Sequence, residues 1–149
     1  MRVADRMRRP AGALDPRDTV SRAARLLGHQ QNGDGIPVVR GSTLVGVLDK
    51  QHVARARPSA ATTLTVGEIE GRLSQVAVGQ ILPPHFVAVG ARTPLSESVR
   101  LLRARHLSLL PVTRGDELIG VLTENALLDL LVEMLADRSD AAQPEERGP

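Results

Sequence analysis

The chain contains an internal repeat, and this duplication limits the possible folds more than any other feature of the sequence. The residues Val20, Ala23, Ala24 and Leu27 recur 75 positions later as Leu95, Ser98, Val99 and Leu102. Both sets have the i, i+3, i+4, i+7 spacing of an amphipathic helix, with Ser98 as the polar exception. Asp18 and Thr93 occupy matching N-cap positions, and Pro94 follows at the expected first helical position.

A second stretch of the repeat predicts a β-hairpin in each copy. At an offset of 74 positions, residues 36–39 match residues 110–113, and residues 41–48 match residues 115–122. In each copy two β-rich runs flank a turn with a glycine, which is typical of a hairpin. Each copy is therefore predicted to run helix, strand, turn, strand, helix.

The repeat also sets the domain organisation. A unit of about 55 residues buries too little surface to be comfortably stable by itself, so we expect two copies that share one apolar interface. The first copy spans residues 1–56 and the second spans residues 78–136. The linker, residues 57–77, is predicted to contain a short helix around Val66–Leu73. Residues 137–149 are predicted to form a disordered acidic tail.

Composition excludes several classes of function. The chain has 149 residues, no cysteine, no tryptophan, no tyrosine and one phenylalanine, Phe86. Without cysteine there is no disulfide framework and no thiol chemistry, and the four histidines lack metal-ligand spacing. The common catalytic and phosphate-loop motifs are absent. One aromatic residue cannot supply a stacking platform for single-stranded nucleic acid. We therefore expect no enzyme, no metal site and no nucleic-acid partner.

Charge is uneven along the chain although the formal net charge is only +2. Residues 1–25 hold seven arginines against three aspartates, a balance of +4, and residues 124–149 hold seven acids against two arginines, a balance of −5. Such asymmetry can steer one end of a molecule toward the opposite end of a partner, whereas a solvated surface is the simpler alternative. The arginine-rich start lacks the apolar core expected of a signal peptide, and no segment reaches the ~20 apolar residues of a membrane span. We expect a cytoplasmic protein without a membrane partner.

Taken in order, the duplicated motifs resemble the CBS domain family in its tandem form, the Bateman module. The matching stretches are residues 3–7, 15–20, 36–39 and 44–48 in the first copy and residues 78–82, 93–95, 109–112 and 118–123 in the second. The linker stretch 58–64 is similar to that of acetoin-utilisation-type CBS pairs. The resemblance implies an α+β fold in which two β-α-β-β-α repeats pack sheet to sheet about a pseudo-two-fold axis.

The resemblance also implies a function. CBS pairs are regulatory modules that bind an adenosine-containing ligand such as AMP, ADP, ATP or S-adenosylmethionine in clefts between the repeats, and their family chemistry is not catalytic. We therefore expect a stand-alone sensor with no cofactor beyond such a ligand, acting on an unknown protein target. The alternative is a ligand-free dimerisation or protein-interaction module with degenerate nucleotide sites.

Family nucleotide sites follow the pattern Gly-x-x-Thr/Ser-x-x-Asp, which the resemblance places after the second strand of each copy. The hydroxyl residue helps to hold phosphate at a helix N-terminus, and the Asp accepts hydrogen bonds from the ribose hydroxyls. Counting from Gly46 gives Asp49 and His52 at these two positions. The first copy therefore lacks the ribose carboxylate, and Asp49 carries negative charge where phosphate would lie. Alternatively, His52 is a solvent-facing residue on a short helix.

In the second copy, counting from Gly120 gives Thr123 and Ala126, so the ribose carboxylate is absent again. Thr123 keeps the expected hydroxyl, although it would equally serve as the N-cap of the last helix. Asn125 lies one position from the missing carboxylate and is an alternative polar partner. The apolar stretch that faces adenine corresponds to Leu109, Leu110 and Pro111, and in the first copy to Ile36 and Pro37, all of which would be buried in an empty module too.

The last predicted helix, residues 126–136, is apolar around most of its circumference. Only Asp129 and Glu133 interrupt it, and their spacing places both on one side. This apolar surface is wider than one sheet contact requires. It either packs beneath both repeats or forms a subunit interface, and we expect a homodimer through the helices.

Overall fold

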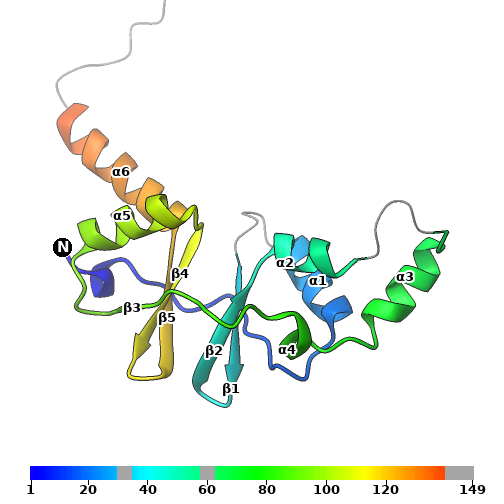
Figure 1. The fold of residues 1–149 in the computed structure, drawn as a ribbon. Coiled ribbons are helices and arrows are strands. Elements are labelled where there is room, and N and C mark those ends of the chain that lie inside the picture. The colour runs from blue at the N-terminus through cyan, green and yellow to red at the C-terminus, as the bar shows by residue number, and fades with distance from the viewer. Residues whose placement is uncertain (30–34, 58–62, 140–149) are drawn as a thin grey trace, which may run out of the picture.

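The computed structural model of the chain describes residues 1–29, 35–57 and 63–139, and its fold confirms the predicted α+β class (Figure 1). One five-stranded sheet has the order β1-β2-β5-β4-β3. The strands are β1 (Ile36–Arg40), β2 (Thr43–Leu48), β3 (Val89–Gly90), β4 (Leu109–Arg114) and β5 (Glu117–Thr123). The helices are η1 (Val3–Asp5), α1 (Val20–His29), α2 (Lys50–Ala56), α3 (Val66–Leu73), α4 (Val78–Ile81), α5 (Leu95–Arg105) and α6 (Glu124–Ser139).

The two hairpins, β1–β2 and β4–β5, are duplicated in detail. Each turns at a glycine with positive φ, Gly41 at +65° and Gly115 at +60°, a conformation that side chains disfavour. Each ladder has one irregularity at the same place, between Val38 and Val39 and between Val112 and Thr113. The predicted repeat is therefore a structural repeat.

The hairpins meet at their turn ends. Thr43 pairs with Glu117, so β2 and β5 lie next to each other and antiparallel. The Leu44 N–H donates to the Asp116 carbonyl at 2.9 Å, and the Leu118 N–H donates to the Ser42 carbonyl at 3.1 Å. The contact between the repeats' sheets thus includes an edge pairing that joins them into one sheet.

The segment that opens each copy packs on the other copy. At the N-terminus, the Val3 N–H donates to the Thr93 carbonyl at 2.9 Å, and Arg8 exchanges backbone hydrogen bonds with Val121. Conversely, the Val78 N–H donates to the Asp18 carbonyl at 2.7 Å. Val3 and Val78 are both fully buried, each in the core of the opposite repeat. This exchange fixes the two repeats relative to each other.

A glycine on the second strand of each hairpin allows the exchanged segment to come close. A Cβ at Gly46 would lie 2.7 Å from the Leu82 side chain, and a Cβ at Gly120 would lie 3.1 Å from the Arg8 carbonyl oxygen. These glycines are equivalent in the repeat. Their lack of a side chain is what the close approach requires.

Two apolar clusters form the core, one for each repeat. The predicted inner helix faces are confirmed, because Val20, Ala23 and Leu27 are buried on α1, and Leu95, Ser98 and Leu102 are buried on α5. Within the part of the chain that the structure describes, the Ser98 hydroxyl has no hydrogen-bond partner. The remaining fully buried large side chains are Val3, Leu14, Ile36, Val38, Leu48, Val78, Leu110, Pro111, Val112 and Leu122.

The predicted N-caps of α1 and α5 are each wrong by one residue, and Pro94, predicted as the first helical residue of α5, is its N-cap. Thr19 caps α1, since its Oγ1 accepts from the Arg22 N–H at 3.1 Å, whereas Asp18 accepts from the Asp15 N–H at 2.8 Å. The Thr93 hydroxyl accepts from the Gly90 N–H at 3.2 Å. The short polar side chains of Asp18 and Thr93 thus accept hydrogen bonds from backbone N–H groups of the turns before the helices. Turn and helix N–H groups compete for such side chains, and sequence spacing alone does not tell which will bind.

The last helix is longer than predicted. Residues 137–139 were expected in the tail but continue α6, which ends at Ser139 and leads away from the strands (Figure 1). Residues 140–149, the rest of the predicted tail, lie outside the described residues, as do residues 58–62 of the linker. Among the described helices, none has the length and apolar content to cross a membrane.

Candidate functional site

A cavity of about 260 Å³ lies between the two repeats. Its walls come from the β2–α2 junction of the first repeat, from the segment before β3, and from the α5–β4 junction of the second repeat. The lining residues are Val47, Asp49, His52, Pro83, His85, Phe86, Val87, Arg105, Leu107, Leu109 and Pro111. The cavity thus joins predicted site residues of both copies.

Asp49 and His52 form a reciprocal cap at the start of α2. The Asp49 carboxylate accepts from the His52 N–H at 2.9 Å, and His52 Nδ1 accepts from the Asp49 N–H at 3.0 Å. With Nδ1 as an acceptor, the neutral ring carries its proton on Nε2. The interpretation of His52 as solvent-facing is wrong, because this cap leaves its side chain only 21% exposed.

On the second repeat, a left-handed residue turns the chain from α5 into β4. His106 has φ of 53° and ψ of 44°, and the Leu107 N–H donates to the Leu102 carbonyl at 2.9 Å. This tight turn places Arg105 and Leu107 together on the cavity wall. A non-glycine residue rarely adopts this conformation, which marks the turn as strongly determined by its surroundings.

The cavity has a polar part and an apolar part. Among its lining residues, Arg105 is the only arginine or lysine and Asp49 is the only carboxylate. Leu109 and Pro111 are buried and supply an apolar wall, and Phe86, the only aromatic residue of the chain, is 41% exposed. Such a cavity suits a ligand with a flat apolar group and a polar end.

The other predicted site residues do not line this cavity. Thr123 caps α6, with its hydroxyl accepting from the Ala126 N–H at 3.2 Å. Ile36 and Leu110 are core residues, paired with Leu48 and Leu122 in their hairpins, and the lining also does not include Pro37 or Asn125. Within residues 1–29, 35–57 and 63–139, no group of three His, Asp or Glu side chains is placed to hold a metal ion.

Sequence reasoning missed several lining residues, mainly Pro83, His85, Phe86, Val87, Arg105 and Leu107. Phe86 carried a usable signal, since it is the single aromatic residue and follows a pair of prolines. Arg105 carried none, because it is one of three arginines on α5.

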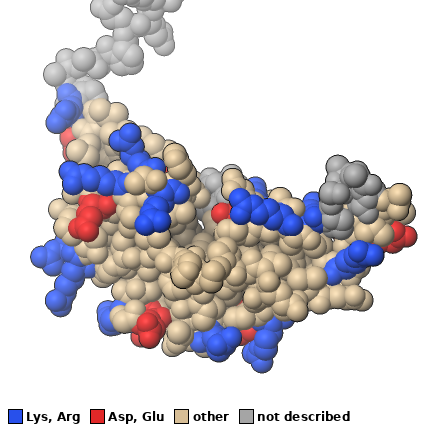
Figure 2. Space-filling view, in the orientation of Figure 1, with Lys and Arg blue, Asp and Glu red and all other residues tan. Residues whose placement is uncertain are grey.

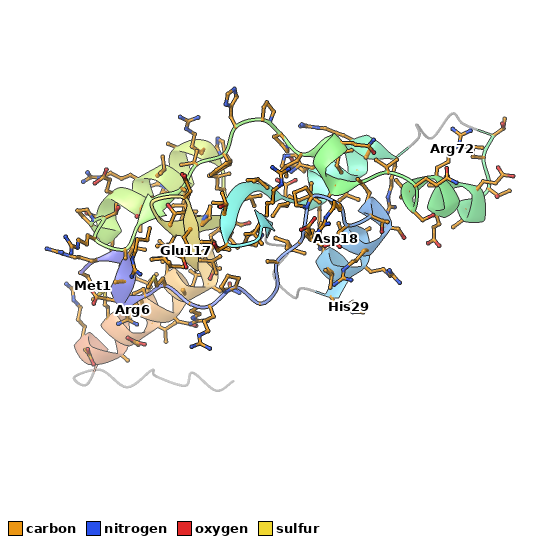
Figure 3. All side chains as sticks on the ribbon, turned by 90° about the horizontal axis from the view of Figure 1, so that it is seen from below. Met1, Arg6, Asp18, His29, Arg72 and Glu117 are labelled. Atoms are coloured by element: carbon orange, nitrogen blue, oxygen red, sulfur yellow. The ribbon has the colours of Figure 1, made fainter. Side chains whose placement is uncertain are left out.

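A second polar feature lies outside the cavity, where the N-terminal segment meets α6. Arg6 and Glu133 form an ion pair at 2.9 Å, and Arg8 and Asp129 form another at 2.6 Å. The hydrogen bond to Glu133 raises the pKa of Arg6 above its ordinary value. Figure 3 places Arg6 beside α6. These pairs occupy the acidic side of α6 that the sequence predicted.

Comparison with known proteins gives a consistent result. A family model described as CBS domain matches the chain twice, at residues 3–59 and 78–133. The chain is 25% identical over 126 residues to the A-adding tRNA nucleotidyltransferase of Geobacter sulfurreducens, which covers 85% of this chain but only 13% of that protein.

Two solved structures are similar over most of the chain. The acetoin utilization protein AcuB of Vibrio cholerae has a TM-score of 0.75 and 19% identity, covering 97% of this chain and 98% of that one. The structure of CBSX2 in complex with AMP has a TM-score of 0.70 and 26% identity, covering 90% of this chain and 98% of that one. At 19% identity, the similarity to the Vibrio cholerae protein concerns the fold alone.

Proposed function

Since the chain belongs to the CBS domain family and contains two copies of the domain, we propose that it is a regulatory module that binds an adenosine-containing ligand between its repeats. The observation that carries the proposal is the cavity that brings Asp49 and His52 together with Leu109 and Pro111. The similarity to CBSX2, whose structure contains AMP, supports the ligand class. A non-catalytic role and a cytoplasmic location stay predictions of the sequence.

The lining chemistry favours a ligand with little negative charge. We place the adenine ring against Phe86 and the apolar wall, where an aromatic face suits a flat base. Arg105 is then the partner for a single phosphate, whereas Asp49 opposes the added charge of a triphosphate. AMP and the sulfonium S-adenosylmethionine are therefore expected to bind more tightly than ATP. Thr123 as a ligand residue stays a prediction, and this cavity does not use it.

Thermal-shift titration tests the proposal. A ligand that binds only the native state raises Tm with concentration, so AMP, ADP, ATP and S-adenosylmethionine are compared at equal concentrations. Arg105→Ala should reduce the shift given by AMP. Arg103→Ala is the matched control, because Arg103 lies on the same helix, is exposed and does not line the cavity. No shift with any of the four at millimolar concentration, in folded protein, would contradict ligand binding.

A ligand-free interaction module is the second candidate. The observation that favours it is the lack of a ribose carboxylate in both copies, where His52 is engaged in a helix cap and Ala126 is buried. This candidate predicts a folded, self-associating protein that none of the four adenosine compounds stabilises. The same titration therefore separates the two functions.

The helices also support a homodimer. On α6 the apolar side chains Leu128, Leu131 and Val132 are 57%, 48% and 66% exposed. Exposure of this apolar surface to water is unfavourable, and contact with a second subunit would bury it. The spacing of these side chains, three and four residues, places them in one stripe. Sedimentation should give twice the 16.0 kDa chain mass at micromolar concentration. A mass of 16.0 kDa under these conditions would contradict the dimer.

A further inference from the structure

Another cavity lies outside the space between the repeats, where α1 faces the linker helix α3. Its volume is about 410 Å³. Figure 1 shows α3 at one end of the molecule, beyond α1. The lining residues are Ser21, Ala24, Arg25, Arg57, Val66, Ile69, Glu70 and Leu73. None of them lines the cavity of the proposed adenosine site, so the two cavities are separate.

One face of each helix forms the walls of this α1–α3 cavity. The lining residues are spaced by three and four positions on both helices, so each set shares one side of its helix. Leu73, at 4% exposure, is the most buried of them, and Ala24 and Ile69 are half-buried. The cavity therefore has an apolar interior that suits a hydrocarbon group.

Charged side chains from three segments line the same cavity. Arg25 on α1 and Arg57, the C-cap of α2, are exposed cations, and Glu70 on α3 is the acid. Within the described part of the chain, none of the three forms an ion pair. Figure 2 shows basic side chains gathered over α1 and α2. Two cations against one acid leave a single positive charge, which a carboxylate would balance through charge-assisted hydrogen bonds.

The elements that build this cavity are not duplicated. By the offsets of the repeat, Arg25 corresponds to Arg100, but Arg57 corresponds to Leu131. Helix α3 lies in the linker, and the described part of the second repeat contains no equivalent helix. The repeated fold therefore does not account for two arginines beside one apolar cavity, which is a feature of the linker.

Helix α3 depends on its contacts across the cavity. Two of its eight residues are Gly67 and Gly71, and a Cβ at either would meet no atom within 4 Å, so packing does not require glycine there. Each glycine weakens the helix relative to alanine, and a helix this short depends on tertiary packing. Of its eight residues only Ile69 and Leu73 are withdrawn from solvent, whereas Val66 is 77% exposed. A bound hydrocarbon group would add contacts to α3 and stabilise it.

We propose that the α1–α3 cavity binds a carboxylate that carries a hydrocarbon chain. The hydrocarbon lies against Val66, Ile69 and Leu73, and the carboxylate accepts hydrogen bonds from Arg25 and Arg57. Burial of the hydrocarbon is the favourable apolar contribution, and the arginines select an anion over a neutral alcohol. Occupancy holds α3 on α1, so this ligand acts at the linker and not in the adenosine cavity.

Calorimetric titration with octanoate tests the site. The wild-type protein should bind octanoate saturably, and octanol, which has the same hydrocarbon without the charge, should bind roughly tenfold more weakly. Arg25→Gln and Arg57→Gln should each weaken octanoate binding about tenfold. Arg22→Gln is the matched control, because Arg22 is exposed on α1 and does not line the cavity. Absence of saturable heat with millimolar octanoate, or an equal loss in all three variants, would overturn the proposal.

Hydrogen exchange separates a ligand in this cavity from adsorption elsewhere. Saturating octanoate should slow amide exchange in α3 and leave exchange in α5 unchanged, because the ligand stabilises only the helices that it touches. Unchanged exchange in α3 would overturn the proposal. Competitive displacement of octanoate by AMP would do the same, since the two cavities share no lining residue. AMP binding is measured separately by the thermal titration, so a failure of the adenosine site leaves this test intact.

Discussion

Asp49 and His52 cap each other at the first turn of α2, with backbone-to-side-chain distances of 2.9 and 3.0 Å in the two directions. In the family pattern these are the positions of the phosphate-binding hydroxyl and the ribose-binding carboxylate. Here the same two side chains stabilise a helix start and form part of the cavity wall. Asp49 and His52 therefore both cap α2 and line the proposed ligand cavity. Substitutions can separate the effect on stability from the effect on ligand binding.

Asp49→Ser should keep the cap and change the ligand preference. Serine is as good an N-cap as aspartate but is uncharged, so stability should stay within a few tenths of a kcal/mol while affinity for AMP and ATP rises. Asp49→Ala removes the cap as well and should cost about 1 kcal/mol of unfolding free energy. Urea denaturation and nucleotide titration of both variants measure the two effects. Equal nucleotide affinity in wild type and Asp49→Ser would place the phosphate elsewhere.

Phe86→Ala should weaken adenosine binding with little change in stability. The ring lies on the cavity wall yet is 41% exposed, so its removal leaves no buried void. Loss of stacking on a base costs about 1–3 kcal/mol, which corresponds to a rise in Kd of roughly fivefold to 150-fold. Calorimetric titration with AMP gives the ratio. Phe86→Tyr keeps the aromatic face and is the matched control, and a Kd unchanged by the alanine variant would show that adenine does not contact this ring.

Thr123→Ala should destabilise the protein without changing ligand affinity in this cavity. The Thr123 hydroxyl accepts from the Ala126 N–H, and loss of an N-cap costs about 1 kcal/mol. Thr123→Ser retains the hydroxyl and should behave as wild type in urea denaturation. A large loss of AMP affinity in Thr123→Ala, beyond its effect on folding, would move the ligand to the opposite side of the module.

Leu128→Glu should convert the dimer into a folded monomer. The side chain is exposed in the single chain, so charge at this position disturbs a subunit contact and leaves the core intact. Sedimentation should give one chain mass, with the circular dichroism spectrum unchanged. Glu97→Leu, an exposed substitution on α5, is a control for a general change of surface charge. A Leu128→Glu protein that remains fully dimeric would exclude the exposed apolar stripe of α6 from the interface.

The sequence was most informative where the signal is local and duplicated. Helix periodicity identified the buried faces of α1 and α5, and glycine placement identified both hairpin turns. Exchange of the opening segments was not predictable in this way, because the Arg8–Val121 pairing joins residues more than a hundred positions apart. Local pattern does not specify which strand edge such a segment will meet.

For the candidate site too, residues in local motifs were predictable, and residues brought in by packing between distant segments were not. Asp49, His52, Leu109 and Pro111 were found by motif position and do line the cavity. Phe86 and Arg105 join them only because of the way in which the repeats pack and the chain turns at His106. Thr123 kept the family hydroxyl, yet the structure gives that hydroxyl a helix cap.

Calorimetric titration of the folded wild-type chain with AMP tests the central claim most directly. The account predicts saturable binding at one site per chain, which Arg105→Ala weakens about tenfold and Arg103→Ala leaves unchanged. No heat of binding and no change in Tm up to millimolar AMP would contradict it, as would binding to which Arg105 and Arg103 contribute equally.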